Sequence, residues 1–167
     1  IEITSNQLTK GIYYLEGSGG NIGLSVGEDG VFIIDDQFAP LTEKIKAEIA
    51  NYTDQPVQFV FNTHFHYDHT DGNENFGAAG AIIVSQENAR KRMSEDQYLT
   101  ILNRPQPAYS VEGLPKITFS DGISFHYNGH TINAFHLGPA HTDGDAIVQF
   151  VEENILHTGD VFVRYGL

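Results

Sequence analysis

The chain has 167 residues, and 9 Lys and Arg stand against 22 Asp and Glu, for a net charge of −13. This negative balance repels phosphate backbones and anionic membrane surfaces, so we expect neither nucleic acid nor a membrane as a partner. Cysteine is absent while 8 histidines are present, which excludes disulfides, thiol nucleophiles and thiolate metal sites. A transition metal would therefore have only nitrogen and oxygen ligands.

The length suits one domain over residues 1–167 with a modest core. No apolar run approaches the length of a membrane span. The start, Ile1-Glu2-Ile3-Thr4, has no initiator Met, no basic residue and no apolar stretch. We therefore expect a processed or trimmed chain, which leaves a removed signal peptide open, and we favour a periplasmic or secreted location over a cytoplasmic one.

The first half of the chain predicts strands that are interrupted by turns and helices. Strands are expected at residues 11–15, 22–26, 31–34, 57–61 and 81–84, with helices from Pro40 to about Tyr52 and from Gln86 to Arg92. The first helix has apolar residues at four-residue spacing, and a proline stands at its start.

The second half predicts mainly strands, at residues 117–119, 123–127, 130–137, 146–151 and 155–157. Asn128-Gly129 is the strongest short hairpin signal in the chain. Residues 103–115 contain three prolines, and we interpret them as a plain surface connection in preference to an active-site flap. Strands, then helices, then strands again favour an α/β layered protein with mixed sheets.

Histidines and aspartates are concentrated directly after the apolar strand at 57–61, in the segment His64-Phe65-His66-Tyr67-Asp68-His69. Residues two apart on an extended segment point the same way, so His64 and His66 can offer their imidazoles to one ion. Asp68 and His69 follow a turn and can face a second position. These ligand types suit Zn, Mn or Fe in a site that exchanges water, and we prefer this interpretation to a polar loop that merely solvates a strand end.

Two later loops can complete such a site. His141 lies at the tip of a loop marked by Gly138 and Pro139, and a third histidine beside one open position is the pattern of a catalytic zinc. Asp160 follows Gly159 just past an apolar strand, where a carboxylate can bridge two cations.

The ordered set His64-x-His66-x-Asp68-His69, then His141 in a Gly-x-x-His-Thr loop, then Gly159-Asp160, resembles the metallo-β-lactamase superfamily along nearly the whole chain. The resemblance implies a four-layer αβ/βα sandwich with its metals at one edge, between two mixed sheets. It implies the following ligands: His64, His66 and His141 on metal one, Asp68 and His69 on metal two, and Asp160 bridging. It favours two zinc ions, with iron or manganese as alternatives.

The resemblance also implies a hydrolase in which a metal-bound hydroxide attacks a small-molecule ester, thioester, lactone or amide. Asp68 would be the catalytic residue that orients the hydroxide. Ligation without cysteine and with a bridging Asp160 resembles the thioester, lactone and phosphodiester hydrolases of the superfamily more than the true β-lactamases. The acidic charge counts against the nuclease branches.

The chain departs from the family pattern near its end. The family supplies a late histidine to metal two, but no histidine follows His157, and the sequence stops at Leu167. We therefore expect a truncated domain, completed by a C-terminal segment or by a second chain. We expect His157 to have a core role or to support a neighbouring ligand rather than to replace the missing ligand.

Two other functions stay open. One is a mononuclear iron oxygenase of the persulfide dioxygenase type, which shares the motif and uses two histidines and an aspartate. The other is a metal-binding module that is inactive as a fragment.

Other polar residues have lesser roles in this interpretation. The Asn-Gly hairpin contains three more histidines. We expect them to occupy alternating positions of the sheet or to form hydrogen bonds rather than to bind metal: His126, His130 and His136. Asp71 and Asp143 flank the ligands and are candidates to orient imidazole N–H groups. The segment Gly17–Gly20 does not match a phosphate loop. Tyr67 would line the pocket or stack on the surface, and Arg164 is a candidate to meet a substrate carboxylate.

Overall fold

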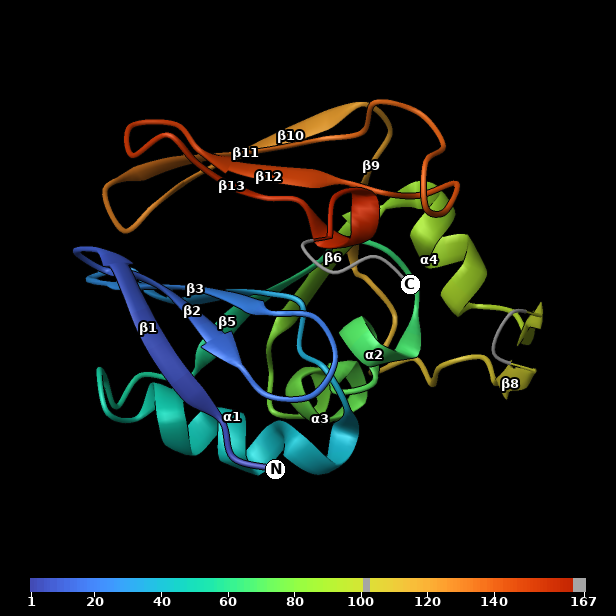
Figure 1. The fold of residues 1–167 in the computed structure, drawn as a ribbon, viewed down its shortest axis with the longest axis horizontal. Coiled ribbons are helices and arrows are strands. Elements are labelled where there is room, and N and C mark those ends of the chain that lie inside the picture. The colour runs from blue at the N-terminus through green and yellow to red at the C-terminus, as the bar shows by residue number, and fades with distance from the viewer. Residues whose placement is uncertain (101–102, 164–167) are drawn as a thin grey trace.

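The computed structural model of the protein describes residues 1–100 and 103–163, and it contains two packed β-sheets with helices beside the first of them (Figure 1). The first sheet has the order β1-β2-β3-β4-β5-β6-β9. Its strands are β1 Thr4–Thr9, β2 Ile12–Glu16, β3 Ile22–Gly27, β4 Gly30–Ile34, β5 Val57–Asn62, β6 Ile82–Gln86 and β9 Ile117–Phe119. The second sheet has the order β10-β11-β12-β13, and its strands are β10 Gly122–Tyr127, β11 His130–Phe135, β12 Ile147–Phe150 and β13 Ile155–His157.

The helices are short. They are α1 Thr42–Ile49, α2 Tyr67–Thr70, α3 Asn73–Ala78 and α4 Glu87–Met93, with 3-10 turns at Ala39–Leu41 and Gly159–Val161. The helix predicted from Pro40 to Tyr52 is therefore a 3-10 turn followed by α1, and the chain turns away after Ile49. The sequence did not predict β1, α2 or α3.

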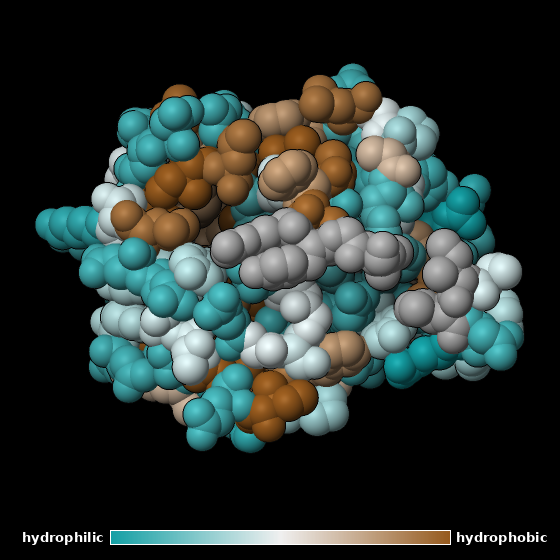
Figure 2. Space-filling model, in the orientation of Figure 1, coloured by the Kyte–Doolittle hydropathy of each residue, from teal (hydrophilic) through white to brown (hydrophobic). Residues whose placement is uncertain are grey.

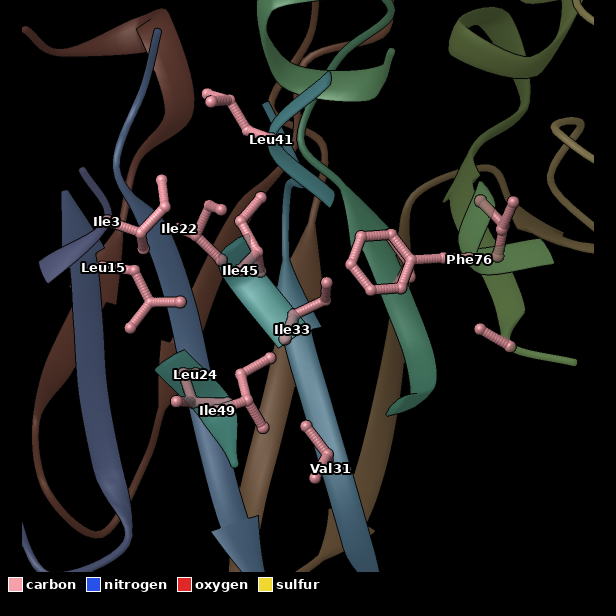
Figure 3. Packing of buried hydrophobic residues seen from close by; sticks show 13 residues of the cluster. Ile3, Leu15, Ile22, Leu24, Val31, Ile33, Leu41, Ile45, Ile49 and Phe76 are labelled. Carbon is pink, nitrogen blue, oxygen red and sulfur yellow. The ribbon is translucent and has the colours of Figure 1, made fainter. Parts of the chain in front are cut away.

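The outer side of the first sheet forms one part of the core. Ile45 and Ile49 of α1 are buried together with Ile33 of β4, and Phe76 of α3 packs into the same cluster (Figure 3). The four-residue spacing of the apolar positions in α1 thus faces this sheet.

The inner side of the first sheet packs against the second sheet. Phe32 and Ile34 of β4 are buried with Ile132 of β11 and Val148 of β12. Successive side chains of a strand point to opposite faces of the sheet. Because both faces of β4 are covered, all of its side chains are buried, and its sequence is a nearly continuous run of apolar residues.

The parallel pairs of the first sheet determine where the functional loops lie. β4 pairs parallel with β5, and β5 pairs parallel with β6. Parallel strands bring their carboxyl ends to the same edge of a sheet, and the loops that follow them meet there. The histidine-rich segment after β5 lies at this edge.

The second sheet contains the predicted hairpin. Asn128 and Gly129 both have positive φ, 54° and 77°, as a type I′ turn between β10 and β11 requires. Among the described residues no helix covers the outer side of this sheet (Figure 1). The fold is thus the predicted mixed α/β sandwich, and the expected fourth layer is not part of the described residues. No helix among these residues is long and apolar enough to cross a membrane.

Residues 103–115 are not a plain surface connection, so this interpretation was wrong. Arg104–Gln106 forms β8 and pairs with β7, Gln97–Leu99. Tyr109 and Leu114 pack against a small apolar cluster around Phe65. We call residues 104–113 the strap, because this segment lies against the histidine-rich loop.

Candidate metal centre

The loop after β5 carries the first histidines of the centre. β5 ends at Asn62, His64 follows in the loop, and His66 stands immediately before the single turn α2. His66 has extended backbone, with φ −64° and ψ 142°, so the chain changes from extended to helical between His66 and His69. The turn that we expected after His66 is therefore a helical turn, and it directs His69 back toward His64, with ring centroids 4.3 Å apart.

Three histidines form the first group of candidate ligand atoms. One nitrogen from each of His64, His66 and His141 lies within 4.8 Å of the others. Nε2 of His141 is 3.0 Å from Nδ1 of His66. The loop that presents His141 connects β11 and β12 and is held by Thr142, whose backbone N–H and hydroxyl both donate to the Asp145 carboxylate at 2.7 and 2.8 Å.

His64, His69 and Asp160 form the second group, with ligand atoms again within 4.8 Å of one another. Asp160 lies in the 3-10 turn after β13, where one carboxylate oxygen is 3.2 Å from Nε2 of His69 and the other is 3.5 Å from Nε2 of His141. Asp160 thus lies between the two groups, at the place that a bridging ligand would take.

Asp68 belongs to neither group, although the resemblance implies it as a ligand. Its nearest carboxylate oxygen is 3.8 Å from Nε2 of His69, and the side chain is about one-third exposed. The structure therefore brings five of the six expected ligands together and leaves Asp68 beside them.

A cation fits this arrangement. Nε2 of His64 is buried and has no hydrogen-bond partner among the described residues, while Nδ1 lies 3.0 Å from the Thr63 hydroxyl. A buried polar atom without a partner is unfavourable, and a metal ion in contact with it removes that cost. Nitrogen and oxygen donors with no sulfur suit Zn, Fe or Mn.

The electrostatics of the centre divide its histidines into two kinds. Burial, together with the neighbouring imidazoles, holds the pKa of His64 well below its ordinary value and also lowers the pKa of His66. Both rings are therefore neutral near pH 7, which is the form that binds a metal. Burial also disfavours a charged His69, but the carboxylates of Asp35 and Asp160 outweigh it and raise the pKa of His69 to about 10. The hydrogen bond with His69 lowers the pKa of Asp160.

Sequence reasoning missed Asp35, which orients one of the histidines. Asp35 follows β4 directly, is fully buried, and accepts a hydrogen bond from Nδ1 of His69 at 2.8 Å. Its signal was a carboxylate immediately after an apolar strand, the same signal that singled out Asp160. By contrast, Asp71 accepts from the backbone N–H of Ala39, and Asp143 pairs with Arg92. Neither orients an imidazole, so that expectation was wrong.

The glycine-rich segment Gly17–Gly20 packs against the centre, a role that the sequence did not reveal. A Cβ atom at Gly20 would lie 2.3 Å from Cε1 of His69, and one at Gly19 would lie 2.5 Å from the carbonyl oxygen of Asp68. Glycine at these positions lets the backbone approach α2.

The remaining histidines have other partners. His157 has hydrogen-bond partners at both ring nitrogens, the carbonyl oxygen of Asn21 at 2.9 Å and the N–H of Gly159 at 3.3 Å. This agrees with a structural role rather than ligation. His130 pairs with Glu153, and His136 donates to the carbonyl of Asp145. His126 is exposed on β10, outside both candidate groups.

The guanidinium of Arg104 stacks over the Tyr67 ring, with its carbon 4.0 Å from the ring centroid, and the Phe38 ring packs against Tyr67 at a tilt of 50°. This agrees with the stacking alternative for Tyr67. Arg164 lies outside the described residues.

A cavity of about 570 Å³ opens beside the second group of ligands, and His69 and Asp160 form part of its wall. Much of the remaining wall comes from β2, the glycine-rich segment and β13 with the residues that follow it, and single residues of β1, β3, β4 and β12 complete it. Hydrophobic side chains gather on the surface over the second sheet near this opening (Figure 2), and Leu156 and Phe162 are 55% and 73% exposed.

Comparison with known proteins identifies the family. Residues 15–167 match the family model described as the metallo-beta-lactamase superfamily, and the chain belongs to that superfamily. Similar solved structures include a metallo-beta-lactamase from Pontibacter korlensis, with TM-score 0.76 and 19% identity, covering 94% of this chain and 71% of that one.

Two further structures agree with this fold. The native FEZ-1 metallo-beta-lactamase from Legionella gormanii gives a TM-score of 0.73 at 19% identity, with 89% of this chain and 58% of that one covered. BJP-1, a subclass B3 metallo-beta-lactamase of Bradyrhizobium japonicum, gives a TM-score of 0.73 at 22% identity, with 89% of this chain and 56% of that one covered. The chain thus spans little more than half the length of these two proteins.

Proposed function

We propose that the protein is a metal-dependent hydrolase that binds zinc and cleaves a small-molecule ester, thioester, lactone or amide. The observation that carries this proposal is the buried, unpartnered Nε2 of His64, which belongs to both groups of candidate ligands. Membership of the metallo-β-lactamase superfamily supports the same conclusion. When bound, a divalent ion supplies a water of lowered pKa and polarises a carbonyl group.

The side chains of the centre would have different roles in metal binding and in hydrolysis. His64, His66 and His141 would hold one ion, and His69 with Asp160 and Asp68 would hold a second. Asp68 is the most accessible carboxylate at His69. Its free oxygen can accept a hydrogen bond from the attacking water and so orient that water toward the carbonyl carbon.

The charge of the protein narrows the substrate class. With a net charge of −13, the surrounding field disfavours polyanions and favours neutral or zwitterionic substrates. The cavity of about 570 Å³ beside His69 and Asp160 has the size of a small-molecule site. Because the structural neighbours named above are metallo-beta-lactamases, a β-lactam belongs among the amides to be tested.

A second candidate function is an iron-dependent oxygenase. The group of His64, His69 and Asp160 offers two histidines and one carboxylate, the donor set of many non-haem iron sites. Under this alternative the protein would bind one iron ion and consume oxygen.

Metal analysis and activity measurements distinguish the two functions. The chain is purified without added metal, its zinc, iron and manganese contents are measured, and it is then assayed against esters, thioesters, lactones and lactams before and after treatment with a chelator. Stoichiometric zinc with hydrolysis that the chelator abolishes supports the hydrolase. Stoichiometric iron with oxygen uptake contradicts it.

A third outcome is a folded chain that holds one tight zinc and hydrolyses none of these substrates. This result would identify a metal-binding module whose active site needs a further segment or a second chain.

A further inference from the structure

The three histidines of the loop after β5 are not held in the same way. His64 has the Thr63 hydroxyl beside Nδ1, and His69 has the Asp35 carboxylate beside Nδ1, so each ring has a partner on the side away from the ligand group. Such partners fix the rotation of a metal-binding imidazole. For His66, the hydrogen-bond partner found among the described residues is His141, itself a candidate ligand.

The backbone on both sides of His66 is held instead by one side chain from the strap. Gln106 is buried, with 5% exposure. Its Nε2 donates to the carbonyl oxygen of Phe65 at 2.8 Å, and its Oε1 accepts from the N–H of Tyr67 at 3.2 Å. Because the carbonyl can only accept and the N–H can only donate, the two partners determine the orientation of the amide.

A second contact from the strap reaches the carbonyl group of His66 itself. The hydroxyl of Thr70 donates to that carbonyl oxygen at 2.9 Å, and the hydroxyl of Tyr109 lies 2.9 Å from the same Thr70 oxygen. The Thr70 hydroxyl also lies 3.2 Å from the carbonyl oxygen of Phe65. Whichever of the two carbonyl oxygens takes its single hydrogen, the Tyr109 hydroxyl then donates to Thr70. The strap therefore supports both peptide groups of His66 from outside the loop.

We propose that Gln106 is a positioning residue, which fixes the backbone at His66 and so aims its imidazole at the ion shared with His64 and His141. The inference rests on the proposed function, because it requires that these histidines bind a metal. Gln106 acts through His66 and touches neither the ion nor the substrate. The strap then sets the geometry of the centre, although it carries no ligand.

Two substitutions test this role. Gln106→Met keeps the length of the side chain and removes both hydrogen bonds, while Gln106→Asn keeps the amide and shortens its reach by one methylene. The matched control is Gln97→Ala, because Gln97 pairs directly opposite Gln106 in the register of β7 and β8 and makes no hydrogen bond to the histidine-rich loop.

Zinc affinity is measured for each protein by competition with a chromophoric chelator, and the visible absorption of the Co²⁺ form reports the ligand geometry. The unfolding of each metal-free protein in urea is measured separately. We expect both Gln106 variants to lose about 10- to 100-fold in zinc affinity and to show a changed cobalt spectrum. The Gln97→Ala protein should match the wild type in both measurements.

The titration of the wild-type protein shows whether the proposed function or only the role of Gln106 is wrong. If the wild type binds neither zinc nor cobalt, the proposed function is wrong, and this inference is overturned together with it. If the wild type binds and the Gln106 variants keep its affinity and spectrum, only the role of Gln106 is overturned, even where their stability in urea is lower. An equal loss in Gln97→Ala would also overturn it, because any change in the β7–β8 pair would then have the same effect.

Discussion

The carboxylate of Asp35 accepts a hydrogen bond from Nδ1 of His69 at 2.8 Å, across 34 positions of the sequence. The same carboxylate accepts from the backbone N–H and the hydroxyl of Thr63, both at 2.8 Å. One buried side chain at the end of β4 thus holds the beginning and the end of the loop that carries the histidines. Asp35 adopts a left-handed backbone conformation, with φ 64°, to present its carboxylate there.

Replacing Asp35 with asparagine should weaken metal binding. Asp35→Asn keeps the shape of the side chain but removes the negative charge beside Nδ1 of His69. We expect zinc affinity to fall by about 10- to 100-fold while the fold is retained, as measured by competition titration and circular dichroism. Asp71→Asn is the matched control, because the Asp71 carboxylate accepts from the backbone of Ala39. Equal affinities in Asp35→Asn and the wild type would contradict the orienting role.

The stability of the metal-free protein should fall at alkaline pH. The pKa of His69 is raised to about 10 in the folded protein, whereas an unfolded histidine titrates near pH ~6.5. A histidine whose pKa is raised by folding contributes its full stabilisation at pH values below its pKa in the unfolded chain. This contribution is lost as the pH rises through its pKa in the folded protein. The free energy of unfolding in urea should therefore decrease between about pH 6.5 and pH 10.

Asp35→Asn provides the comparison for this pH dependence. Burial and the charge of Asp35 raise the pKa of Asp36 well above its ordinary value. The contribution of Asp36 to stability therefore also falls with rising pH, starting near pH ~4. Asp35→Asn removes the charge that raises the pKa of both His69 and Asp36, so it should flatten the decrease at alkaline pH. A slope identical to that of the wild type would show that His69 is not responsible.

Gly20→Ala should weaken metal binding at His69 and lower the stability of the protein, although Gly20 is not a candidate ligand. The added methyl group would lie 2.3 Å from Cε1 of His69, so either the glycine-rich segment or the imidazole must move. We expect lower thermal stability and weaker binding of the ion held by His69, measured by calorimetry and by the zinc content after dialysis. Gly122→Ala is a control for the loss of a glycine elsewhere, since Gly122 lies in β10 without a left-handed backbone, and the nearest atom to a Cβ there is the carbonyl oxygen of Ala134 at 3.2 Å. Full zinc content and unchanged stability in Gly20→Ala would contradict the close approach.

The substitutions His66→Ala and His141→Ala should each release metal and abolish turnover. Both side chains lie at the outer side of the centre, half-buried and exposed respectively, so the sandwich should remain folded. Metal content and circular dichroism check this expectation. His126→Ala removes an exposed histidine of β10 that lies in neither ligand group and should leave both measurements unchanged. Unchanged metal content in either ligand variant would refute the assignment.

His157→Gln should keep the metal. Both ring nitrogens of His157 have partners in the backbone, and a glutamine amide can donate to the carbonyl of Asn21 in the same way. We expect zinc content equal to that of the wild type and a loss of stability of about 1 kcal/mol at most. Loss of one zinc ion from this variant would show that His157 is the missing ligand after all.

The candidate ligands were predictable because each stands in a compact, unusual pattern directly after an apolar strand. His64, His66 and His69 are close in sequence, so local geometry alone brings them near one another. His141 and Asp160 were candidates from their own loops, but their approach to these histidines depends on how the second sheet packs against the first, which no local pattern indicates.

The supporting residues were less predictable. Asp35 and Gln106 act through hydrogen bonds to residues 34 and 41 positions away, and no local period or motif marks such a contact. Residues 103–115, which include the strap, looked like a loop because Pro105, Pro107 and Pro115 interrupt any regular pattern. The contacts of the strap with Phe65 and Thr70 are tertiary, so no local pattern indicates them. The turns α2 and α3 are too short for hydrophobic periodicity to indicate them.

The origin of the ligands has a mechanical consequence for the whole molecule. His64 and His66 extend from the first sheet, and His141 lies between two strands of the second. An ion bound to all three histidines would cross-link the two sheets of the sandwich. The sequence has no cysteine, so no disulfide can link them. By mass action, the resistance of the sheets to separation then rises with the concentration of free metal. The protein's lifetime in a cell would follow its supply of metal as well as its sequence.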